Sequence, residues 1–401
     1  MYARHLAPCI QQYVQEYPII ALVGPRQSGK TTLAKHLFPH YSYISLENVA
    51  TRRLAAEDPT GFLKTHGALL IIDEAQHVPE LFSSLQEWVD ENGEPGQFIL
   101  TGSSQFLLIE GISQSLAGRI ATFTLFPFSW PEIERSPRQE GSDTIFRSFH
   151  KDRSPVSHED LLATLLRGSY PRIYDKQLDS AKWYENYIFT YVERDVRMSL
   201  NVRNTRTFEH FLLLCASRSG HLLDYSDLSN ALGIAVATVK EWIAILEASG
   251  IIFLLPPFFQ NYSKRLVKRP KLYFIDTGIL CHLLSIETTS HLKGHPLLGS
   301  LFETFIISDC YKRFTNSGKR PPLYFWRDRS GNEIDLLLYD GVKGFPIEIK
   351  LSHSFHPEYR KNISRWLELS GNRADRGLIL YCGAHAVQLD EPIPALPWYT
   401  V

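Results

Sequence analysis

Short apolar segments alternate with amphipathic segments over the first third of the chain. The apolar segments are residues 18–23, 68–72 and 97–100. Each is rich in Ile, Leu or Val, which is typical of buried parallel strands. Between the second and third segments, Leu81, Leu85 and Trp88 are spaced to lie on one face of a helix. This alternation predicts an α/β fold with a doubly wound parallel sheet.

The pattern changes after residue 134. Residues 135–158 are polar without a clear period, which predicts a linker or loop. A helical period then runs from 159 to about 252, and apolar runs return at residues 323–326, 334–339, 345–349 and 377–381. We therefore expect an N-terminal α/β domain, a linker, a helical and winged-helix domain, and a basic connector with a second α/β domain. Their expected boundaries are 1–134, 135–158, 159–260 and 261–401.

Composition narrows the class of protein. The 401 residues include 42 Lys and Arg against 43 Asp and Glu, a net charge of −1, which argues against a polybasic binder. No segment reaches the roughly 18 apolar residues of a membrane span, and the start lacks a secretion signal. The cysteines are Cys9, Cys215, Cys281, Cys310 and Cys382, scattered without zinc-binding spacing. We expect a cytoplasmic protein with reduced thiols and no membrane partner.

The strongest chemical signal is a GxxxxGK[ST] motif between the first expected strand and a helix. The candidate nucleotide-binding residues are Gly24, Pro25, Arg26, Gln27, Ser28, Gly29, Lys30, Thr31 and Thr32. Backbone N–H groups of such a loop bind phosphate oxygens at a helix N-terminus. Lys30 would reach the β and γ phosphates and act in catalysis, and the Thr31 hydroxyl would bind Mg²⁺. The motif predicts a P-loop NTPase with ATP and Mg²⁺ as ligand and cofactor.

Two carboxylates follow the second expected strand, in the form of a Walker B motif. Asp73 would hold Mg²⁺, because a carboxylate at the end of a buried strand is costly unless it serves a cation. Glu74 would polarise the attacking water. The alternative is that Asp73 and Glu74 only cap the helix expected over residues 75–88.

Two further candidates follow the third expected strand. Ser103, rather than Ser104, would lie between Asp73 and the γ phosphate and sense it, although both serines could instead cap the next helix. Arg119 is the candidate for neutralising charge in the transition state, in cis or from a neighbouring subunit of a homo-oligomer. Its alternative is a surface arginine after a glycine turn. The sequence has no NKxD element, so guanine specificity has no support.

These motifs resemble a known family. Residues 17–134, with GPRQSGKTTL, LLIIDEAQHVPEL, FILTGSS and SLAGRI followed by LFPFSWPEI, resemble the AAA_14 type of the AAA+ superfamily. The C-terminal half is similar to the DUF4143 domain in three strings, at residues 191–196, 264–278 and 299–303. The resemblance implies an AAA+ architecture and ATP as the nucleotide. It implies no particular substrate.

Residues 222–259 have the pattern of a winged helix. A helix and its glycine stop span 224–233, and residues 237–247 occupy the position of a recognition helix. That second helix offers Lys240 against Glu241 and Glu247, so groove reading of DNA and protein interaction both remain open. Nearby lies a basic run of Lys264, Arg265, Lys268, Arg269 and Lys271. It could contact the phosphates of DNA or ATP, or be a solvated face.

The last third carries a third candidate site. Glu303 lies in a helix, Asp335 at the head of a strand, and Glu348 and Lys350 on the next strand, where alternate residues share a face. This pattern is similar to the PD-(D/E)xK nuclease fold, a restriction-endonuclease-like α/β domain. Glu303, Asp335 and Glu348 would hold Mg²⁺ and Lys350 would orient the attacking water. The alternative is an ordinary Glu-x-Lys strand face.

Two hypotheses follow. In the first, the chain hydrolyses ATP and its nucleotide state controls a DNA-directed nuclease-like region. In the second, ATP occupancy switches the binding of a protein partner and the C-terminal fold is an inactive scaffold.

Overall fold

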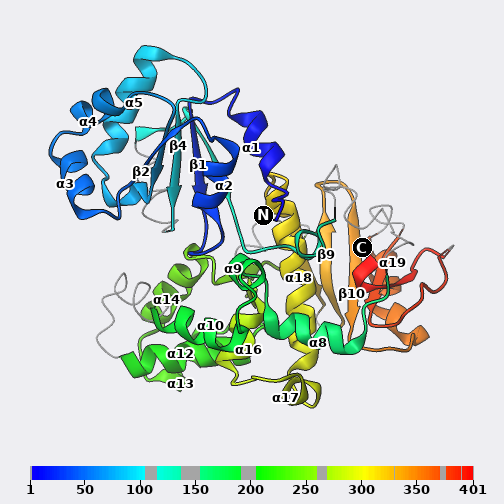
Figure 1. The fold of residues 1–401 in the computed structure, drawn as a ribbon. Coiled ribbons are helices and arrows are strands. Elements are labelled where there is room, and N and C mark those ends of the chain that lie inside the picture. Colours follow the sequence, from blue (N-terminus) through cyan, green and yellow to red (C-terminus); the bar gives the residue numbers. More distant parts are fainter. Residues whose placement is uncertain are drawn as a thin grey trace.

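The computed structural model describes most of the chain. The described ranges are residues 2–103, 115–136, 154–190, 205–259, 269–328, 330–370, 376–389 and 391–400. Ser104, most of the expected linker, the string at 191–196, and Lys264, Arg265 and Lys268 of the basic run lie outside them. None of the helices in these ranges is long and apolar enough to cross a membrane. In Figure 1 a sheet domain lies above a group of helices, and a second sheet lies to the right.

A five-stranded parallel sheet forms the N-terminal part. Its strands are β1 (Ile19–Val23), β2 (Ser42–Ser45), β3 (Leu70–Asp73), β4 (Phe98–Gly102) and β5 (Ile120–Thr124), in the order β2-β3-β4-β1-β5. The doubly wound α/β prediction is confirmed. The two edge strands, β2 and β5, were not expected, because both alternate with polar, partly exposed residues instead of forming an apolar run.

Helices cover both faces of this sheet. They are α1 (Ala7–Tyr13), α2 (Lys30–Leu37), α3 (Val49–Glu57), α4 (Pro59–His66), η1 (Ala75–His77) and α5 (Leu81–Asn92). The short helix α7 (Trp130–Ile133), after β5, packs instead in the core of the later parts of the chain. On one face, Ile20 and Leu22 of β1 share a core with α1 and α2. On the other, Ile19 and Ala21 share a core with α4 and α5. The alternation of side chains along each strand therefore gives two separate cores.

The middle of the chain is helical. Its elements are α8 (His158–Arg167), α9 (Pro171–Asp175), α10 (Ser180–Tyr187), α12 (Thr205–Ser217), α13 (Tyr225–Leu232), α14 (Val236–Ala248), β6 (Ile252–Leu255), β7 (Lys271–Phe274), α16 (Thr277–Leu283) and α17 (Thr289–Lys293). Asp224 caps α13 and Gly233 ends it in the left-handed conformation. β6 and β7 pair antiparallel behind α14, which is the order of elements in a winged helix.

The C-terminal part is a mixed sheet between helices. Its elements are α18 (Leu298–Asn316), β8 (Leu323–Arg327), β9 (Glu333–Tyr339), β10 (Gly344–Lys350), η4 (Pro357–Arg360), α19 (Lys361–Ser370), β11 (Leu378–Tyr381), β12 (Ala395–Pro397) and η6 (Trp398–Thr400). The strand order is β12-β11-β10-β9-β8. Leu378 and Leu380 share a core with α18, whereas Ile379 and Tyr381 share one with α19. The two helices therefore cover opposite faces.

One hydrophobic core joins the helical part to the C-terminal sheet. It runs from Phe126 to Tyr399 and includes residues of α8, α14, β7, α18 and β10. It also crosses the boundary expected near residue 260, because β6 and β7 pair across that boundary. The N-terminal sheet, by contrast, has cores of its own.

A buried ion pair connects the N-terminus to the segment that leaves the first sheet. Arg4 Nε lies 3.0 Å from Glu132 Oε1, and both side chains are almost fully buried. The same guanidinium donates to the carbonyl oxygens of Ser28, at 2.7 Å, and Phe126, at 2.6 Å. Burial alone would raise the pKa of Glu132, but Arg4 and the N–H groups of Ser129 and His5 hold it below its usual value. Glu132 is therefore a carboxylate whose charge depends on Arg4.

Replacing this arginine should destabilise the fold. We predict that Arg4→Ala lowers the free energy of unfolding by about 3–5 kcal/mol, because Glu132 is left buried and unpaired. The shift of the urea unfolding midpoint measures the loss. The matched control is Arg4→Ala with Glu132→Gln, which removes the buried charge and should recover part of it. Exposed ion pairs contribute less than about 1 kcal/mol to the free energy of unfolding. A loss of that size for Arg4→Ala would contradict a stabilising role for the buried pair of Arg4 and Glu132.

Candidate functional site

The glycine-rich loop lies between β1 and α2, at the carboxyl edge of the parallel sheet. Gly24 has φ 136° and Gly29 has φ 98°, a region that side chains disfavour. A Cβ on Gly24 would lie 2.4 Å from the carbonyl oxygen of Leu125. Gly24 therefore lets the loop turn closely against the end of β5, and α2 begins directly at Lys30.

Lys30 is enclosed by its own loop. Its Nζ donates to the carbonyl oxygens of Gly24 and Pro25, both at 2.9 Å. Burial lowers the pKa of Lys30 to about 8, against the opposing effect of Glu74 and Asp73. The structure thus places the predicted lysine beside both predicted carboxylates, with a charge that burial has made easier to lose.

The structure brings Thr31 and Asp73 together. Thr31 Oγ1 donates to Asp73 Oδ1 at 2.9 Å, and Tyr43 donates to Oδ2 at 2.8 Å. Thr101, at the end of β4, donates to Oδ1 as well. Sequence reasoning missed Tyr43 and Thr101, although Thr101 directly follows an expected strand. A hydroxyl and a carboxylate at hydrogen-bond distance are oxygen ligands of the kind that fit Mg²⁺.

Glu74 is held by contacts with Ser103 and Gln76. It has φ 55°, and its Oε2 accepts from the Ser103 N–H at 3.2 Å and the Ser103 hydroxyl at 2.7 Å. Gln76 donates to the same oxygen. Ser103 therefore contacts Glu74, whereas the sequence placed it beside Asp73. Gln76 was not expected.

Arg119 lies at the opposite edge of the sheet. It directly precedes β5, whose first residue Ile120 pairs with Ile19, the first residue of β1, whereas the loop follows Val23 at the other end. A five-residue strand spans about 16 Å. Arg119 also forms an exposed ion pair with Asp90, at 2.5 Å. The prediction that Arg119 acts in cis is therefore wrong. Arg119 lies where β5 begins, whereas the nucleotide loop lies where β5 ends. A role in a neighbouring subunit stays a prediction.

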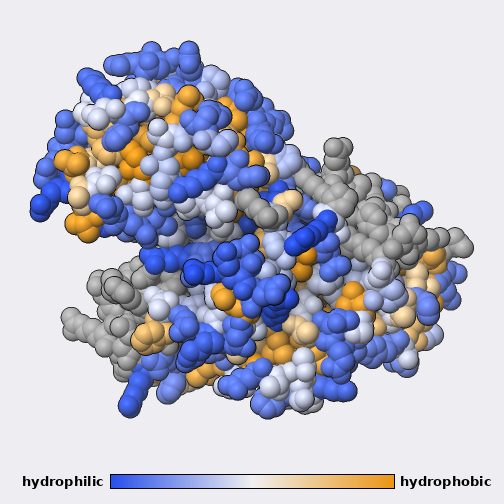
Figure 2. All heavy atoms as spheres, viewed as in Figure 1, coloured by the Kyte–Doolittle hydropathy of each residue, from blue (hydrophilic) through white to orange (hydrophobic). Residues whose placement is uncertain are grey.

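A cavity of about 570 Å³ opens beside the loop. Besides loop residues, the cavity is lined by the two predicted carboxylates, Asp73 and Glu74, and by Tyr2, Arg4, Glu47, Phe128, Pro171, Arg172, Asp175 and Lys176. Figure 2 shows a hollow with mostly hydrophilic residues between the N-terminal domain and the helices below. The residues around α9 are distant in sequence and carry no motif, so sequence reasoning missed them. A larger cavity, of about 710 Å³, lies between β5 and α14 and includes none of the predicted site residues.

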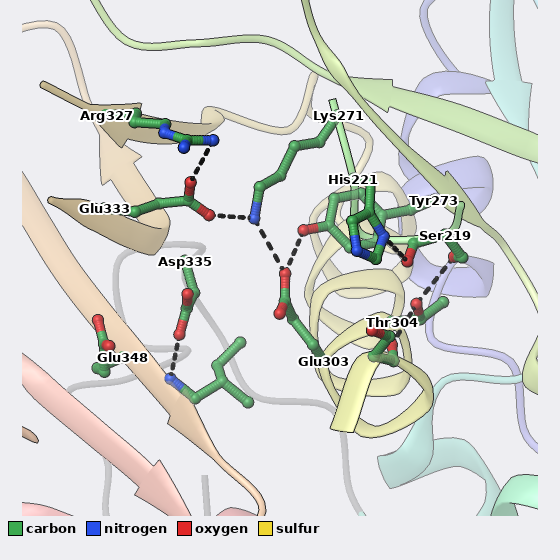
Figure 3. A network of polar contacts seen from close by, with 12 residues as sticks. Ser219, His221, Lys271, Tyr273, Glu303, Thr304, Arg327, Glu333, Asp335 and Glu348 are labelled. Carbon is green, nitrogen blue, oxygen red and sulfur yellow. Dashed lines mark hydrogen bonds and ion pairs between the residues drawn. The ribbon is translucent and has the colours of Figure 1, made fainter. Parts of the chain in front are cut away.

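Three of the predicted C-terminal residues lie together on β9 and β10. Lys350 Nζ lies 2.6 Å from Glu348 Oε1 and 3.7 Å from Asp335 Oδ2. Asp335 Oδ2 also accepts from the Ile349 N–H at 2.8 Å, as Figure 3 shows. Burial, and then the charge of Asp335, raise the pKa of Glu348 to about 8. β9 and β10 pair antiparallel with Ile347 opposite Leu336, and this register brings the two carboxylates and the lysine to one face.

Glu303 does not join them as a metal ligand. Its Oε1 accepts from Tyr273 at 2.5 Å and lies 3.2 Å from Lys271 Nζ, which also pairs with Glu333 at 2.5 Å (Figure 3). Within the described ranges, no three His, Cys, Asp or Glu side chains are arranged to hold a metal ion. The predicted set of Glu303, Asp335 and Glu348 is therefore not assembled in this arrangement, because Glu303 is turned to Lys271.

The basic run also differs from expectation in its described part. Lys271 is buried and paired with carboxylates, so it is neither a solvated side chain nor placed to contact DNA or ATP phosphates. Burial opposes its charge, but Glu303, Glu333 and Asp335 raise the pKa of Lys271. Arg269 pairs with Asp224 at 2.5 Å. On α14, Lys240 and Glu241 are both exposed, so that helix presents no basic face.

Three family models match consecutive parts of the chain. An AAA domain model of the AAA_14 type matches residues 16–134, and a domain of unknown function, DUF4143, matches 298–401. A further domain of unknown function, DUF8612, matches 158–290. The strings at 191–196 and 264–278 therefore lie in the DUF8612 match, and the string at 299–303 lies in the DUF4143 match.

Two solved structures show limited likeness to the whole chain. A Walker-type ATPase of Pyrococcus abyssi is 16% identical with a TM-score of 0.46, over 71% of this chain and 96% of that one. The RuvB Holliday junction branch migration motor of Thermotoga maritima is 19% identical with a TM-score of 0.30, over 63% and 87%. The assignment to the P-loop fold therefore rests on the strand order and the loop described above.

Curated relatives span nearly the whole chain. An uncharacterised protein of Mycobacterium tuberculosis, Rv2008c, is 30% identical over 98% of this chain and 83% of its own length. An uncharacterised protein of Methanocaldococcus jannaschii, MJ1637, is 22% identical over 97% and 86%. The chain belongs to the family of AAA-domain proteins of the AAA_14 type that carry a C-terminal DUF4143 domain.

Proposed function

We propose that the chain binds ATP with Mg²⁺ at the loop between β1 and α2 and hydrolyses it. The observation that carries the proposal is the hydrogen bond between Thr31 and Asp73 beside the buried ammonium of Lys30. The Thr31 hydroxyl and the Asp73 carboxylate would hold Mg²⁺, which when bound neutralises charge on the phosphates. Lys30 would exchange its two carbonyl partners for phosphate oxygens.

Glu74 would act as the group that orients and deprotonates water. In this structure Ser103 and Gln76 donate to its Oε2, and Glu74 lines the cavity beside the loop, where a substrate water would bind. Arg172 and Lys176 extend from the segment around α9 into the same cavity. Their positive charges would be drawn toward the phosphates, which would close the helical part over the nucleotide.

We further infer that the bound nucleotide controls the C-terminal region. A network of buried hydrogen bonds would connect the two. Phe128, in the nucleotide cavity, donates its N–H to the Ser169 carbonyl at 2.9 Å. The Ser169 N–H and hydroxyl donate to Asp276 Oδ2 at 2.7 and 2.6 Å. Lys312 of α18 donates to the Ser169 hydroxyl at 2.8 Å and to the Phe128 carbonyl at 3.3 Å. These contacts link the cavity to the end of β7.

The controlled region would be a DNA-directed nuclease-like site. Asp335 and Glu348 would hold a divalent cation, and Lys350, 2.6 Å from Glu348, would orient the attacking water. The alternative is that this region is an inactive scaffold and that ATP switches binding of a protein partner. The pairing of Glu303 with Lys271 and the absence of a basic face on α14 favour that alternative for the state described here.

We predict Mg²⁺-dependent ATP hydrolysis by the full chain. Lys30→Ala should abolish nucleotide binding, because it removes the buried cation that faces the phosphates. Glu74→Gln should bind ATP as the unchanged protein does but lower turnover by about 100-fold or more, because the base is lost. Phosphate release and nucleotide binding are measured with and without double-stranded DNA.

Strand cleavage measured in the same reactions separates the two hypotheses. Asp335→Asn should abolish cleavage and leave ATP binding intact if the C-terminal site is a nuclease. ATP binding without any cleavage by the unchanged protein would support the scaffold. Hydrolysis retained by a clean preparation of Lys30→Ala would contradict the assignment of the ATP site.

Nucleotide affinity should also depend on pH. Below pH 8, Lys30 is charged in the free protein and in the complex, so affinity should be level. Above pH 8 the free lysine loses its proton, whereas the phosphates keep the bound lysine charged. Affinity should then fall by about tenfold per pH unit and binding should take up protons. Titration calorimetry in two buffers measures both effects. Lys30→Arg, which does not titrate in this range, should show no such fall.

A further inference from the structure

Two of four neighbouring carboxylates pair with one lysine that belongs to a different part of the fold. Glu303 comes from α18, Glu333 and Asp335 from β9, and Glu348 from β10, whereas Lys271 begins β7 of the winged-helix hairpin. Figure 3 shows the ammonium reaching from β7 between Glu333 and Glu303, with Asp335 and Glu348 beside them. An acidic group of this kind attracts a cation, and here the cation is supplied by the chain itself.

We propose that Lys271 takes the place of a divalent cation and keeps the C-terminal acidic site closed to metal until β7 withdraws. This inference rests on the proposed function of that site and adds its regulation. The Lys271 ammonium lies 2.5 Å from Glu333 Oε1 and 3.2 Å from Glu303 Oε1, and its side chain is only 5% exposed. A buried ammonium with two carboxylate partners is held firmly, because moving it away from them would leave its own charge buried and unpaired.

One oxygen in the group still lacks a partner. Glu348 Oε1 pairs with Lys350, but within the described residues its buried Oε2 has no hydrogen-bond partner. The Glu348 side chain is 4% exposed, so water does not readily satisfy this oxygen. A carboxylate oxygen left in this way is suited to a metal ion, which would bind it together with Asp335.

The position of Glu303 follows from the same contact. Its Oε1 is shared by Lys271 and the hydroxyl of Tyr273, which are both residues of β7. If β7 withdrew, Glu303 would lose both partners and become free to turn toward Asp335 and Glu348. Lys271 thus both supplies the charge of a cation and holds away the third oxygen ligand.

The route for withdrawal begins at the nucleotide cavity. β7 ends at Phe274, and Asp276, two residues later, accepts both hydrogen bonds from Ser169. Ser169 lies just before Pro171 and Arg172, which line the cavity. Closure of that segment on a nucleotide would therefore act on the strand that carries Lys271.

Metal titration of the full chain without nucleotide tests the closure. We expect Mn²⁺ to bind Lys271→Met at least about tenfold more tightly than the unchanged protein, because the competing cation is gone. Lys271→Arg is the matched control: it keeps the charge and should stay as weak as the unchanged protein. Calorimetry measures affinity, and a rise of Tm with Mn²⁺ reports binding independently.

A second variant guards against misfolding of Lys271→Met. Glu333→Gln removes one partner of Lys271 without removing a proposed metal ligand, so it should also tighten Mn²⁺ binding. Adding Asp335→Asn to either variant should abolish the increase in Mn²⁺ affinity. This control shows that the metal binds at Asp335 and measures any Mn²⁺ that binds elsewhere. Equal Mn²⁺ affinity in the unchanged protein, Lys271→Met and Glu333→Gln, or no binding in any of them, would overturn the proposal.

ATP binding measured on the same samples keeps this test separate from the ATPase proposal. If the wild-type protein does not bind ATP, the assignment of the ATP site is contradicted. The effect of the Lys271 variants on Mn²⁺ affinity would still be a valid test of the closure. Tighter Mn²⁺ binding by the variants without any strand cleavage would support the closure by Lys271 while refuting nuclease activity.

Discussion

The buried ion pair between Arg4 and Glu132 is the contact on which the arrangement of the two halves depends. The Arg4 guanidinium, near the N-terminus, also donates hydrogen bonds to the Ser28 carbonyl of the nucleotide loop and to the Phe126 carbonyl after β5. A charge buried in this way is tolerated only when its partners are in place, so the contact favours one geometry over its near alternatives. The loop is therefore fixed to the segment that leads into the helical part.

The same junction continues into the C-terminal half through buried polar groups. Trp130, two residues before Glu132, donates its N–H to Asp309 of α18 at 2.5 Å. Lys312, three residues further along α18, joins Phe128 and Ser169, and burial lowers the pKa of this lysine. Such groups have few alternative partners when a segment moves. A shift at the nucleotide cavity would therefore have to rearrange them as a set, which suits a two-state element.

Local patterns in the sequence predicted the main residues of the candidate nucleotide site, which the structure brings together beside one loop. The loop, its lysine and the two carboxylates each lie within one strand and its following turn, and the apolar runs predicted the inner strands. The edge strands β2 and β5 were missed because one side of each faces solvent, which removes the apolar run. Tyr43 and Thr101 reach Asp73 from neighbouring strands, and only the strand order brings them there.

The remaining residues could not be placed from local patterns, because their positions depend on contacts between segments that are distant in the sequence. Arg119 was misplaced because its role depends on which end of β5 meets the nucleotide loop. Lys271 was grouped with its basic neighbours in the sequence. The β6–β7 hairpin instead places its side chain next to carboxylates that lie some thirty to eighty residues later in the chain. The carboxylates on β9 and β10 were expected together because alternation along paired strands is a local rule. The contact of Glu303 and Glu333 with Lys271 of β7 was not expected, because it joins residues that are distant in the sequence.

Hydrogen exchange of the full-length Glu74→Gln protein, with ATP, with ADP and without nucleotide, tests most directly whether the nucleotide site controls the C-terminal region. We predict that ATP changes amide exchange in three segments together, namely residues 24–32, residues 169–176 and residues 271–276. The last two are joined by Ser169 and Asp276. Exchange that changes only in residues 24–32 would contradict control of the C-terminal region by nucleotide.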